Sequence, residues 1–301
     1  MAAPRKRRAE NFSNQEPKKS IPGPTNIKQF VIMIVLYICR KSLFLDTKYR
    51  IGIYLIGTSA GSMIFDVFAA PGSGFSRKDS FLNVYFAKFS WGWTFLLVGT
   101  FVFLTSRIYC CGEIKLVIKH LSRLLVGTAF WFFWTTGFQH VENATGMCTS
   151  TKFSDKKSCS HGGHKWFGFD TSGHAFLLIH CLLIISEEAK SFQNWDKIPV
   201  AIEEETDRPR LTEMQLSSAQ ISYDDLSIYV KWSVVSLTIL TALWDIMLLG
   251  TIMYYHSMPQ KLLGACFAIL TWFVTYQFWY TIPGWSPGLP GQGLLRYHYI
   301  K

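Results

Sequence analysis

Long apolar runs constrain this chain more than any other feature of its sequence. Stretches of roughly 20 residues, enough to cross the hydrocarbon core of a bilayer as a helix, recur along its 301 residues. A composition of 49% hydrophobic and only 17% charged residues excludes an ordinary soluble domain. The bilayer interior offers no water to backbone groups, and these runs are too long and uniform for barrel strands. The sequence therefore predicts an all-α, polytopic membrane protein.

We predict a bundle of six transmembrane helices. The spans are expected at about residues 51–70, 89–106, 119–138, 173–187, 229–253 and 262–282. The fourth is the weakest, because its clean apolar stretch from Ala175 to Ser186 is short. An earlier run, Phe30 to Cys39, reaches only about half a span and lies between Lys28 and Arg40-Lys41. We interpret it as an interfacial helix; the alternative is a seventh span, which would reverse the amino terminus.

The spans divide the chain into a basic segment 1–50, a membrane domain 51–282 and a tail 283–301, in which Pro283 to Pro290 suggests an extended cytosolic path. The formal net charge is +10. It is concentrated ahead of the first span, in Arg5, Lys6, Arg7, Arg8, Lys18, Lys19, Lys28, Arg40, Lys41, Lys48 and Arg50. This pattern indicates a cytosolic amino terminus rather than a nucleic-acid partner. Attraction to anionic head groups is a secondary interpretation, and no cleavable signal peptide is evident.

Counting spans sorts the loops onto two faces. Loops 71–88, 139–172 and 254–261 share one face, and loops 107–118 and 188–228 share the other; the last is acidic and is expected to be a solvated cytosolic loop. The first face carries the glycosylation acceptor Asn143-Ala144-Thr145 and the pair Cys148 and Cys159. These features favour an oxidising lumen, with a disulfide between the two cysteines. The alternatives are an unused sequon with free thiols, or a zinc site with His161 and His164, whose spacing matches no common pattern.

Two histidines are predicted on the lumenal face, each where a polar loop meets an apolar run. His174 follows Ser172-Gly173 at the start of the fourth span. Asp170, Thr171 or Ser172 can cap that helix, whose free amide groups favour an anion, and Gly173 lets a phosphate approach the backbone. A histidine there is placed to donate a proton. His256, after the fifth span, can act as a phosphoryl-accepting nucleophile. The alternative for each is an ordinary histidine at the head-group level.

Phosphoryl transfer also requires positive charge around the phosphate oxygens. The candidates on the same face are Lys88, Asn83, Lys261, Arg77 and Lys78, any of which is otherwise ordinary positive or polar surface. The sequence contains no Walker loop, dinucleotide fingerprint or Gly-x-Ser-x-Gly elbow. No cofactor is expected and no residue is assigned as a metal ligand, while the sequence leaves metal dependence open.

Four further residues are unusual for their predicted positions. His180 and Asp245 lie inside spans, where ionisable groups normally face the bundle interior. Asp245 precedes His256 by eleven residues, on the order of 16 Å along a helix, which is too far to orient it. We interpret Asp245 as structural or as part of an inner polar pocket. Cys110-Cys111, at a cytosolic span end, are candidates for acylation.

Several blocks of sequence occur in a distinctive order between about residues 50 and 290. They are Leu82-Asn83-Val84-Tyr85-Phe86-Ala87-Lys88 with Trp91 and Trp93-Thr94-Phe95, Leu124-Leu125-Val126-Gly127-Thr128-Ala129, Gly168-Phe169-Asp170-Thr171-Ser172-Gly173-His174 with Phe176-Leu177-Leu178, Glu187-Glu188, His256 with Gln260-Lys261, Phe278-Trp279-Tyr280 and Ser286-Pro287-Gly288-Leu289-Pro290. In these blocks the chain resembles the fat storage-inducing transmembrane proteins of the endoplasmic reticulum, which are tied to lipid-droplet formation.

The resemblance implies a lipid-phosphatase-like core and an activity. The expected reaction is hydrolysis of the diphosphate of fatty acyl-CoA to acyl 4′-phosphopantetheine and adenosine 3′,5′-bisphosphate. His174 matches the general acid of the second lipid-phosphatase motif, and His256 matches the nucleophile of the third. The first motif, Lys-x6-Arg-Pro, is absent, no Ser-Arg precedes His256, and Gln260 stands where an orienting Asp is expected. The phosphate clamp is therefore left open, with Ser172, Gly173, Lys88, Asn83 and Lys261 as its candidates.

Two other functions are compatible with the same predicted membrane domain. The family also has a proposed non-enzymatic role, in which it binds triacylglycerol and diacylglycerol in the bilayer and partitions them into droplets. A phosphatidate or sphingolipid phosphatase would share the histidine site but not the substrate. In each case we expect a multi-pass protein of the endoplasmic reticulum membrane, with both termini cytosolic and the histidines lumenal.

Overall fold

The computed structural model describes residues 26–68, 70–72, 77, 80–207 and 210–297. Within them the chain is almost entirely helical. The α-helices are α1 (Ile27–Leu43), α2 (Thr47–Val67), α3 (Ser90–Tyr109), α4 (Ile114–Thr145), α5 (Lys156–His161), α6 (Gly173–Ala189), α7 (Ile198–Asp207), α8 (Glu213–Tyr254) and α9 (Met258–Trp272). The shorter elements are the π-helices η1 (Leu82–Ala87) and η4 (Phe273–Phe278), the 3-10 turns η2 (Lys190–Phe192), η3 (Trp195–Lys197) and η5 (Trp279–Thr281), and the strands β1 (Met147–Cys148) and β2 (Trp166–Phe167).

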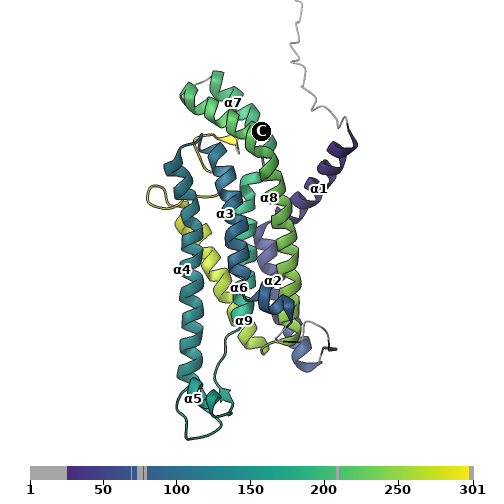
Figure 1. The fold of residues 1–301 in the computed structure, drawn as a ribbon, viewed down its shortest axis with the longest axis vertical. Helices are drawn as coiled ribbons and strands as arrows, with labels where there is room; N and C mark the ends of the chain where they lie inside the picture. The colour runs from purple at the N-terminus through teal and green to yellow at the C-terminus, as the bar shows by residue number, and fades with distance from the viewer. Residues whose placement is uncertain (1–25, 69, 73–76, 78–79, 208–209, 298–301) are drawn as a thin grey trace, which may run out of the picture.

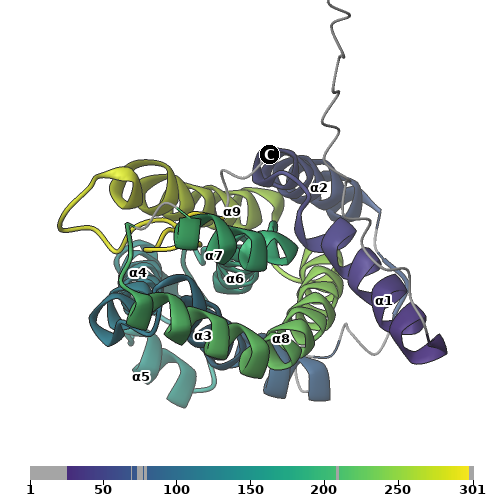
Figure 2. The ribbon, with the colours of Figure 1, turned by 90° about the horizontal axis from the view of Figure 1, so that it is seen from above.

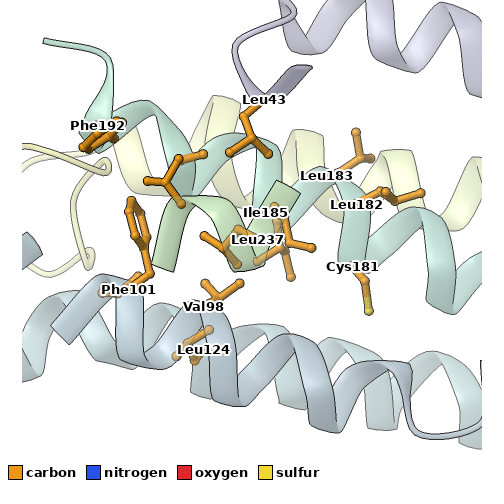
Figure 3. Packing of buried hydrophobic residues seen from close by; sticks show 14 of the residues in the cluster. Leu43, Val98, Phe101, Leu124, Cys181, Leu182, Leu183, Ile185, Phe192 and Leu237 are labelled. Atoms are coloured by element: carbon orange, nitrogen blue, oxygen red, sulfur yellow. The ribbon is translucent and has the colours of Figure 1, made fainter. Parts of the chain in front are cut away.

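Helix α6 lies in the middle of the bundle. It contacts α2, α3, α4, α8 and α9, and the view along the bundle shows these helices around it (Figure 2). Every residue of α6 from Ala175 to Ala189 is buried. A helix that is apolar all round belongs in such a position. Figure 3 shows Ile185 of α6 next to Leu237 of α8, with Val98 of α3 nearby.

Four helices among the described residues are long and apolar enough to cross a membrane. They are α3, α4, α8 and the helical run Met258–Thr281 that begins with α9. The predicted count of six spans is therefore confirmed only in part. Helix α6 has only 17 residues. Because other helices surround it, it does not have to match the thickness of the bilayer as a lipid-exposed helix does. Helix α2 has 21 residues but includes Lys48, Arg50 and Asp66, which make it less apolar.

The described helices also differ from the predicted spans in their ends. Helix α4 is 32 residues long and α8 is 42, so both extend well beyond the apolar stretches that predicted them. Helix α1 covers the run predicted to be interfacial and packs against α6 and α8; its place at the interface stays a prediction. The basic residues 5–19 lie outside the described residues.

The two ends of the bundle carry different substructures (Figure 1). Helix α7 lies at one end and α5 at the other. Beside α5, β1 and β2 form an antiparallel pair in which Met147 faces Phe167 and Cys148 faces Trp166. Cys148 and Cys159 form a disulfide that joins this pair to α5. The two sulfurs are thus bonded to each other, which removes them as thiolate ligands for the alternative zinc site.

The predicted cytosolic loop 188–228 is largely helical, which corrects that expectation. It contains η2, η3, α7 and the first turns of α8. Thr212 and Gln215 form a capping box that begins α8, and Glu205 is buried and pairs with Arg210. This segment is therefore helical and partly packed, whereas five of its acids, Glu203, Glu204, Asp207, Asp224 and Asp225, are exposed as expected for a solvated segment.

The tail after the last span also packs against the bundle instead of extending away from it. The Leu295 amide donates to the Tyr109 carbonyl at 3.0 Å, and the Tyr297 hydroxyl donates to the Ser191 carbonyl at 2.5 Å. The Lys119 ammonium donates to the carbonyl of Gly284. These bonds tie the tail to the α3–α4 turn and to the end of α6.

Candidate active site

The two predicted histidines lie at the same end of the bundle, opposite α7. His174 is the second residue of α6, and His256 lies in the short turn between α8 and α9. The two imidazoles interact electrostatically, and His174 also interacts with Lys88. The structure thus brings together three of the predicted site residues, from the start of α6, the α8–α9 turn and the residue after η1.

His174 is held at the start of α6 by the cap of that helix. Of the three capping candidates, Ser172 takes the position: its hydroxyl accepts a hydrogen bond from the Ala175 amide at 3.3 Å. The His174 ring stacks on Tyr255, with 6.5 Å between the ring centroids. Its Nε2 atom is buried and has no hydrogen-bond partner among the described residues. A buried polar atom left unsatisfied is costly, so it marks a position where a ligand atom is expected.

His256 adopts a backbone conformation that is uncommon for residues other than glycine. Its φ is 58°, in the left-handed region, where such residues cluster at functional sites. Its Nδ1 atom lies 3.6 Å from Oδ2 of Asp170. A carboxylate beside Nδ1 orients an imidazole and leaves Nε2 available for chemistry. Asp170 therefore occupies the orienting position that the resemblance assigned to Gln260.

Gln260 has a structural role instead. Its side-chain oxygen accepts a hydrogen bond from the Ser257 amide and completes the capping box of α9. Its carbonyl accepts the Ser172 amide at 3.1 Å, which ties the start of α9 to the start of α6. Gly264 permits this approach, because a Cβ there would lie 2.6 Å from the Ser172 carbonyl oxygen. The two histidine-bearing segments are thus locked together by backbone contacts.

The other predicted phosphate ligands fall into two groups. Gly173 is open, since a Cβ built on it meets nothing within 4 Å, and Lys88 is exposed. Asn83 lies in η1 and lines a small pocket with Tyr255, the residue that stacks on His174. Lys88 and Gly173 therefore lie near His174, with open space at Gly173, whereas Asn83 is placed near the site only through Tyr255.

Lys261 is engaged elsewhere. Its side chain is 1% exposed, and its ammonium donates to the Ile252 carbonyl at 2.8 Å and lies 3.6 Å from Asp66. Asp66 also accepts the Met258 amide at 2.7 Å. Lys261 and Asp66 therefore link α2, the end of α8 and the start of α9, next to the turn that carries His256. The Arg77 carbonyl accepts the Ser80 amide, and Lys78 lies outside the described residues.

The remaining ionisable candidates lie away from this end. His180 is buried, and its Nε2 lies 3.2 Å from the Gly127 carbonyl oxygen, between α6 and α4. Burial raises the pKa of Cys110 to about 12 and that of Cys111 to about 11. Because the thiolate is the nucleophile, these raised pKa values leave little reactive cysteine at neutral pH for the predicted acylation.

The sequence analysis identified the candidate functional residues but missed residues that contact them. Asp170 was considered only as a helix cap, and Asp66 was not considered. For Asp170 a signal was present, because it lies within the conspicuous block that ends at His174. Asp66 was an acid at the end of an otherwise apolar run, where it needs a partner.

A bundle of apolar helices with histidines, a lysine and an open helix start at one end defines an integral membrane protein with a candidate anion-binding centre. The profile of the fat storage-inducing transmembrane protein family matches residues 72–142 and 138–276. The chain belongs to this family. No solved structure matches it, so the lipid-phosphatase-like core stays a prediction.

Curated relatives cover most of the chain. It is 40% identical over 288 residues to the acyl-coenzyme A diphosphatase FITM2 of Drosophila melanogaster, an overlap of 91% of this chain and 68% of that protein. It is 38% identical over 241 residues to the protein of that name from Homo sapiens, covering 77% of this chain and 82% of the relative. The fat storage-inducing transmembrane protein 1 of Mus musculus is 32% identical over 228 residues, which are 73% of this chain and 69% of the relative.

Proposed function

We propose that this protein hydrolyses the phosphoanhydride bond of fatty acyl-CoA. The observation that carries the proposal is the placement of His174 and His256 at one end of the bundle, with the unsatisfied Nε2 of His174 beside the open start of α6. Relatives named acyl-coenzyme A diphosphatase, 40% and 38% identical to this chain, support the choice of substrate. The products are acyl 4′-phosphopantetheine and adenosine 3′,5′-bisphosphate.

The reaction proceeds in two steps. His256, oriented by Asp170 at Nδ1, attacks one phosphorus through Nε2, and the bridging P–O bond breaks. His174 gives its proton to the departing bridging oxygen. A water molecule then cleaves the P–N bond and releases the second product, which restores both histidines. Ser172 and Gly173 present the amide groups of the α6 start to the phosphate oxygens. Lys88 and Asn83 complete the clamp, while Lys261 supports the turn from below.

The test is hydrolysis of oleoyl-CoA by the purified full-length protein, with both products resolved by mass. We expect His174→Gln to lower kcat by about 100-fold or more, the usual range for a lost general acid. His256→Asn should abolish turnover while preserving the fold, because asparagine tolerates the left-handed backbone. His161→Gln is the matched control, since His161 is exposed and lies on α5. Equal turnover in all four proteins contradicts the catalytic assignment.

We place the site in the lumen of the endoplasmic reticulum, with the protein spanning that membrane and both termini cytosolic. The glycosylation acceptor Asn143 and the Cys148–Cys159 disulfide support this orientation, because they lie at the histidine end of the bundle. From there the enzyme would maintain lipid balance and support droplet formation. Release of inorganic phosphate from phosphatidate, with no acyl-CoA cleavage, would instead assign it to the lipid phosphatases.

A second candidate function is the binding of triacylglycerol and diacylglycerol within the bilayer. It is favoured by an open, mostly apolar groove between α2 and α8. This function predicts that a protein lacking both His174 and His256 still restores lipid droplets in cells deprived of the native protein. Failure of that rescue at normal expression argues against a purely non-enzymatic role.

A further inference from the structure

The turn that carries His256 has a backbone conformation that its surroundings must enforce. The φ of His256 is 58°, a region that costs free energy for a residue other than glycine and persists only where neighbouring structure holds it. The turn is short, because α8 ends at Tyr254 and α9 begins at Met258. Its own residues supply one constraint, the capping box of Ser257 and Gln260. The other contacts at its two flanks therefore help to set the direction of the His256 imidazole.

Lys261 holds the helix end that precedes the turn. Its ammonium donates to the Ile252 carbonyl at 2.8 Å, four residues before His256. Carbonyls in the last turn of a helix lack intrahelical partners, and a positive charge is favourable there. The Lys261 side chain is 1% exposed. Its ammonium is thus a buried group directed at the backbone of α8.

Asp66 holds the helix start that follows the turn. Its Oδ2 accepts the Met258 amide at 2.7 Å, two residues after His256. Met258 is the first residue of α9, where amides lack intrahelical partners and a negative charge is favourable. Asp66 belongs to α2, and Gly61 of the same helix helps α2 to lie close to α8, since a Cβ there would lie 3.0 Å from the Ile252 side chain.

The two charges match the helix ends that they contact. The carboxylate meets an amide after His256, and the ammonium meets a carbonyl before it. Oδ1 of Asp66 lies 3.6 Å from the Lys261 ammonium, so each charge also partly balances the other. Both flanks of the turn are therefore fixed to one ion pair. Half of that pair comes from α2, a helix that contributes no residue to the proposed hydrolysis.

We propose that Asp66 and Lys261 are positioning residues for His256. By fixing both flanks of the turn, they keep His256 in its left-handed conformation, with Nδ1 near Asp170 and the ring near His174. A displacement of about 1 Å in a reacting group lowers the rate by about 100-fold, so the pair contributes to kcat rather than to substrate binding. The effect on rate rests on the proposed hydrolysis, whereas the conformation of the turn is measurable without it.

The first measurement is steady-state hydrolysis of oleoyl-CoA by the purified full-length variants. Asp66→Leu removes the acceptor of the Met258 amide, and we expect kcat to fall about 100-fold with KM unchanged. Lys261→Met keeps the stem without the ammonium and should behave alike. Asp66→Asn should recover most of the lost kcat, because its side-chain oxygen still accepts the Met258 amide.

Asp46→Leu is the matched control for these variants. Asp46 lies at the other end of α2, where its carboxylate accepts the Lys48 amide at 2.9 Å. The variant removes the same kind of contact from the same helix, but far along the chain from the turn. Its kcat should equal that of the unaltered protein.

The second measurement reports the conformation of the turn without hydrolysis. Diethyl pyrocarbonate modifies accessible imidazoles, and mass spectrometry gives the rate at each histidine. The side chain of His256 is 20% exposed, and it should react severalfold faster in Asp66→Leu and Lys261→Met, because a released turn exposes the ring. The exposed His161 should react equally in all the proteins. The buried His180 should stay unmodified wherever the bundle is intact.

The outcomes separate the two proposals. Unaltered reactivity of His256 in both Asp66→Leu and Lys261→Met overturns the positioning role and leaves the hydrolysis standing. Full kcat in both variants, or a rise in KM with kcat retained, overturns it as well. Modification of His180 in both variants shows a general loss of the fold and assigns the pair to stability instead. If the unaltered protein does not cleave oleoyl-CoA, the proposed function fails, and the reactivity of His256 alone decides whether the pair sets the turn.

Discussion

The position of single atoms at the start of α6 explains why a glycine precedes His174. Gly173 is the first residue of the helix, and the space where its Cβ would lie is empty. The amide groups there are free of intrahelical partners and attract anions. A phosphate that binds to them needs the same space that a side chain would occupy.

We therefore predict that Gly173→Ala separates activity from stability. Alanine fits the unliganded helix and favours it, so the melting temperature should be unchanged or slightly raised. The added methyl should obstruct the phosphate and raise KM for oleoyl-CoA by about tenfold, equivalent to 1.4 kcal/mol of binding. Steady-state kinetics and thermal unfolding in detergent check both parts, and an unaltered KM would remove Gly173 from the phosphate clamp.

At the same scale, Asp170 is expected to act through His256 rather than on the substrate. It is half exposed and its carboxylate lies 3.6 Å from Nδ1 of His256. We predict that Asp170→Asn lowers kcat severalfold and leaves KM unchanged, because an uncharged amide still reaches Nδ1 but orients the ring less strongly than a carboxylate does. A rise in KM without loss of kcat would show that Asp170 contacts the substrate instead.

At the scale of helices, a buried ion pair joins α4 to α6 at the end opposite the histidines. Nε and Nη2 of Arg123 contact Oε1 and Oε2 of Glu188 at 2.6 and 2.7 Å, and both side chains are 1% exposed. The Tyr276 hydroxyl donates to the same carboxylate from η4 at 2.7 Å. The Glu188 carboxylate thus links three segments of the bundle, α4, α6 and η4.

We predict that Glu188→Leu lowers the free energy of unfolding by about 3–5 kcal/mol, because it leaves a buried guanidinium without its partner. The double variant Arg123→Met with Glu188→Leu should recover much of that loss, since the uncompensated charge is gone. Denaturant unfolding in detergent measures the three proteins. A double variant that is no more stable than Glu188→Leu would show that the hydrogen bonds, and not the charge, dominate.

At the scale of the whole molecule, the two ends of the bundle must face different compartments. Asn143 is exposed at the histidine end, and Met214 is exposed near the start of α8 at the other. We predict that the protein carries a glycan that Asn143→Gln removes, seen as a gel shift. A Met214→Cys variant should react with an impermeant maleimide in cells whose plasma membrane alone is opened. Maleimide protection of that cysteine would reverse the orientation.

The helical elements were predictable where their signal is local. Apolar runs predicted α3, α9 and the apolar core of α4, α6 and α8, because burial in lipid or protein requires them. The polar first turns of α8 were missed, although Thr212 and Gln215 are a recognisable start signal. Hydropathy measures only the apolar part of a helix that continues into water.

From the amino-acid sequence alone we could predict that this chain is a helical membrane protein. The sequence also predicted that His174, His256 and Gly173 lie at one end of the bundle, and that Cys148 and Cys159 lie on the same face. Those properties depend on residue type and on counting crossings. The tertiary structure decided that Asp170 rather than Gln260 accompanies His256, that Lys261 pairs with Asp66, that the tail packs against the bundle, and that Asp245 meets Tyr54. These contacts join segments distant along the chain, so the packing of whole helices determines them and no local pattern reports it.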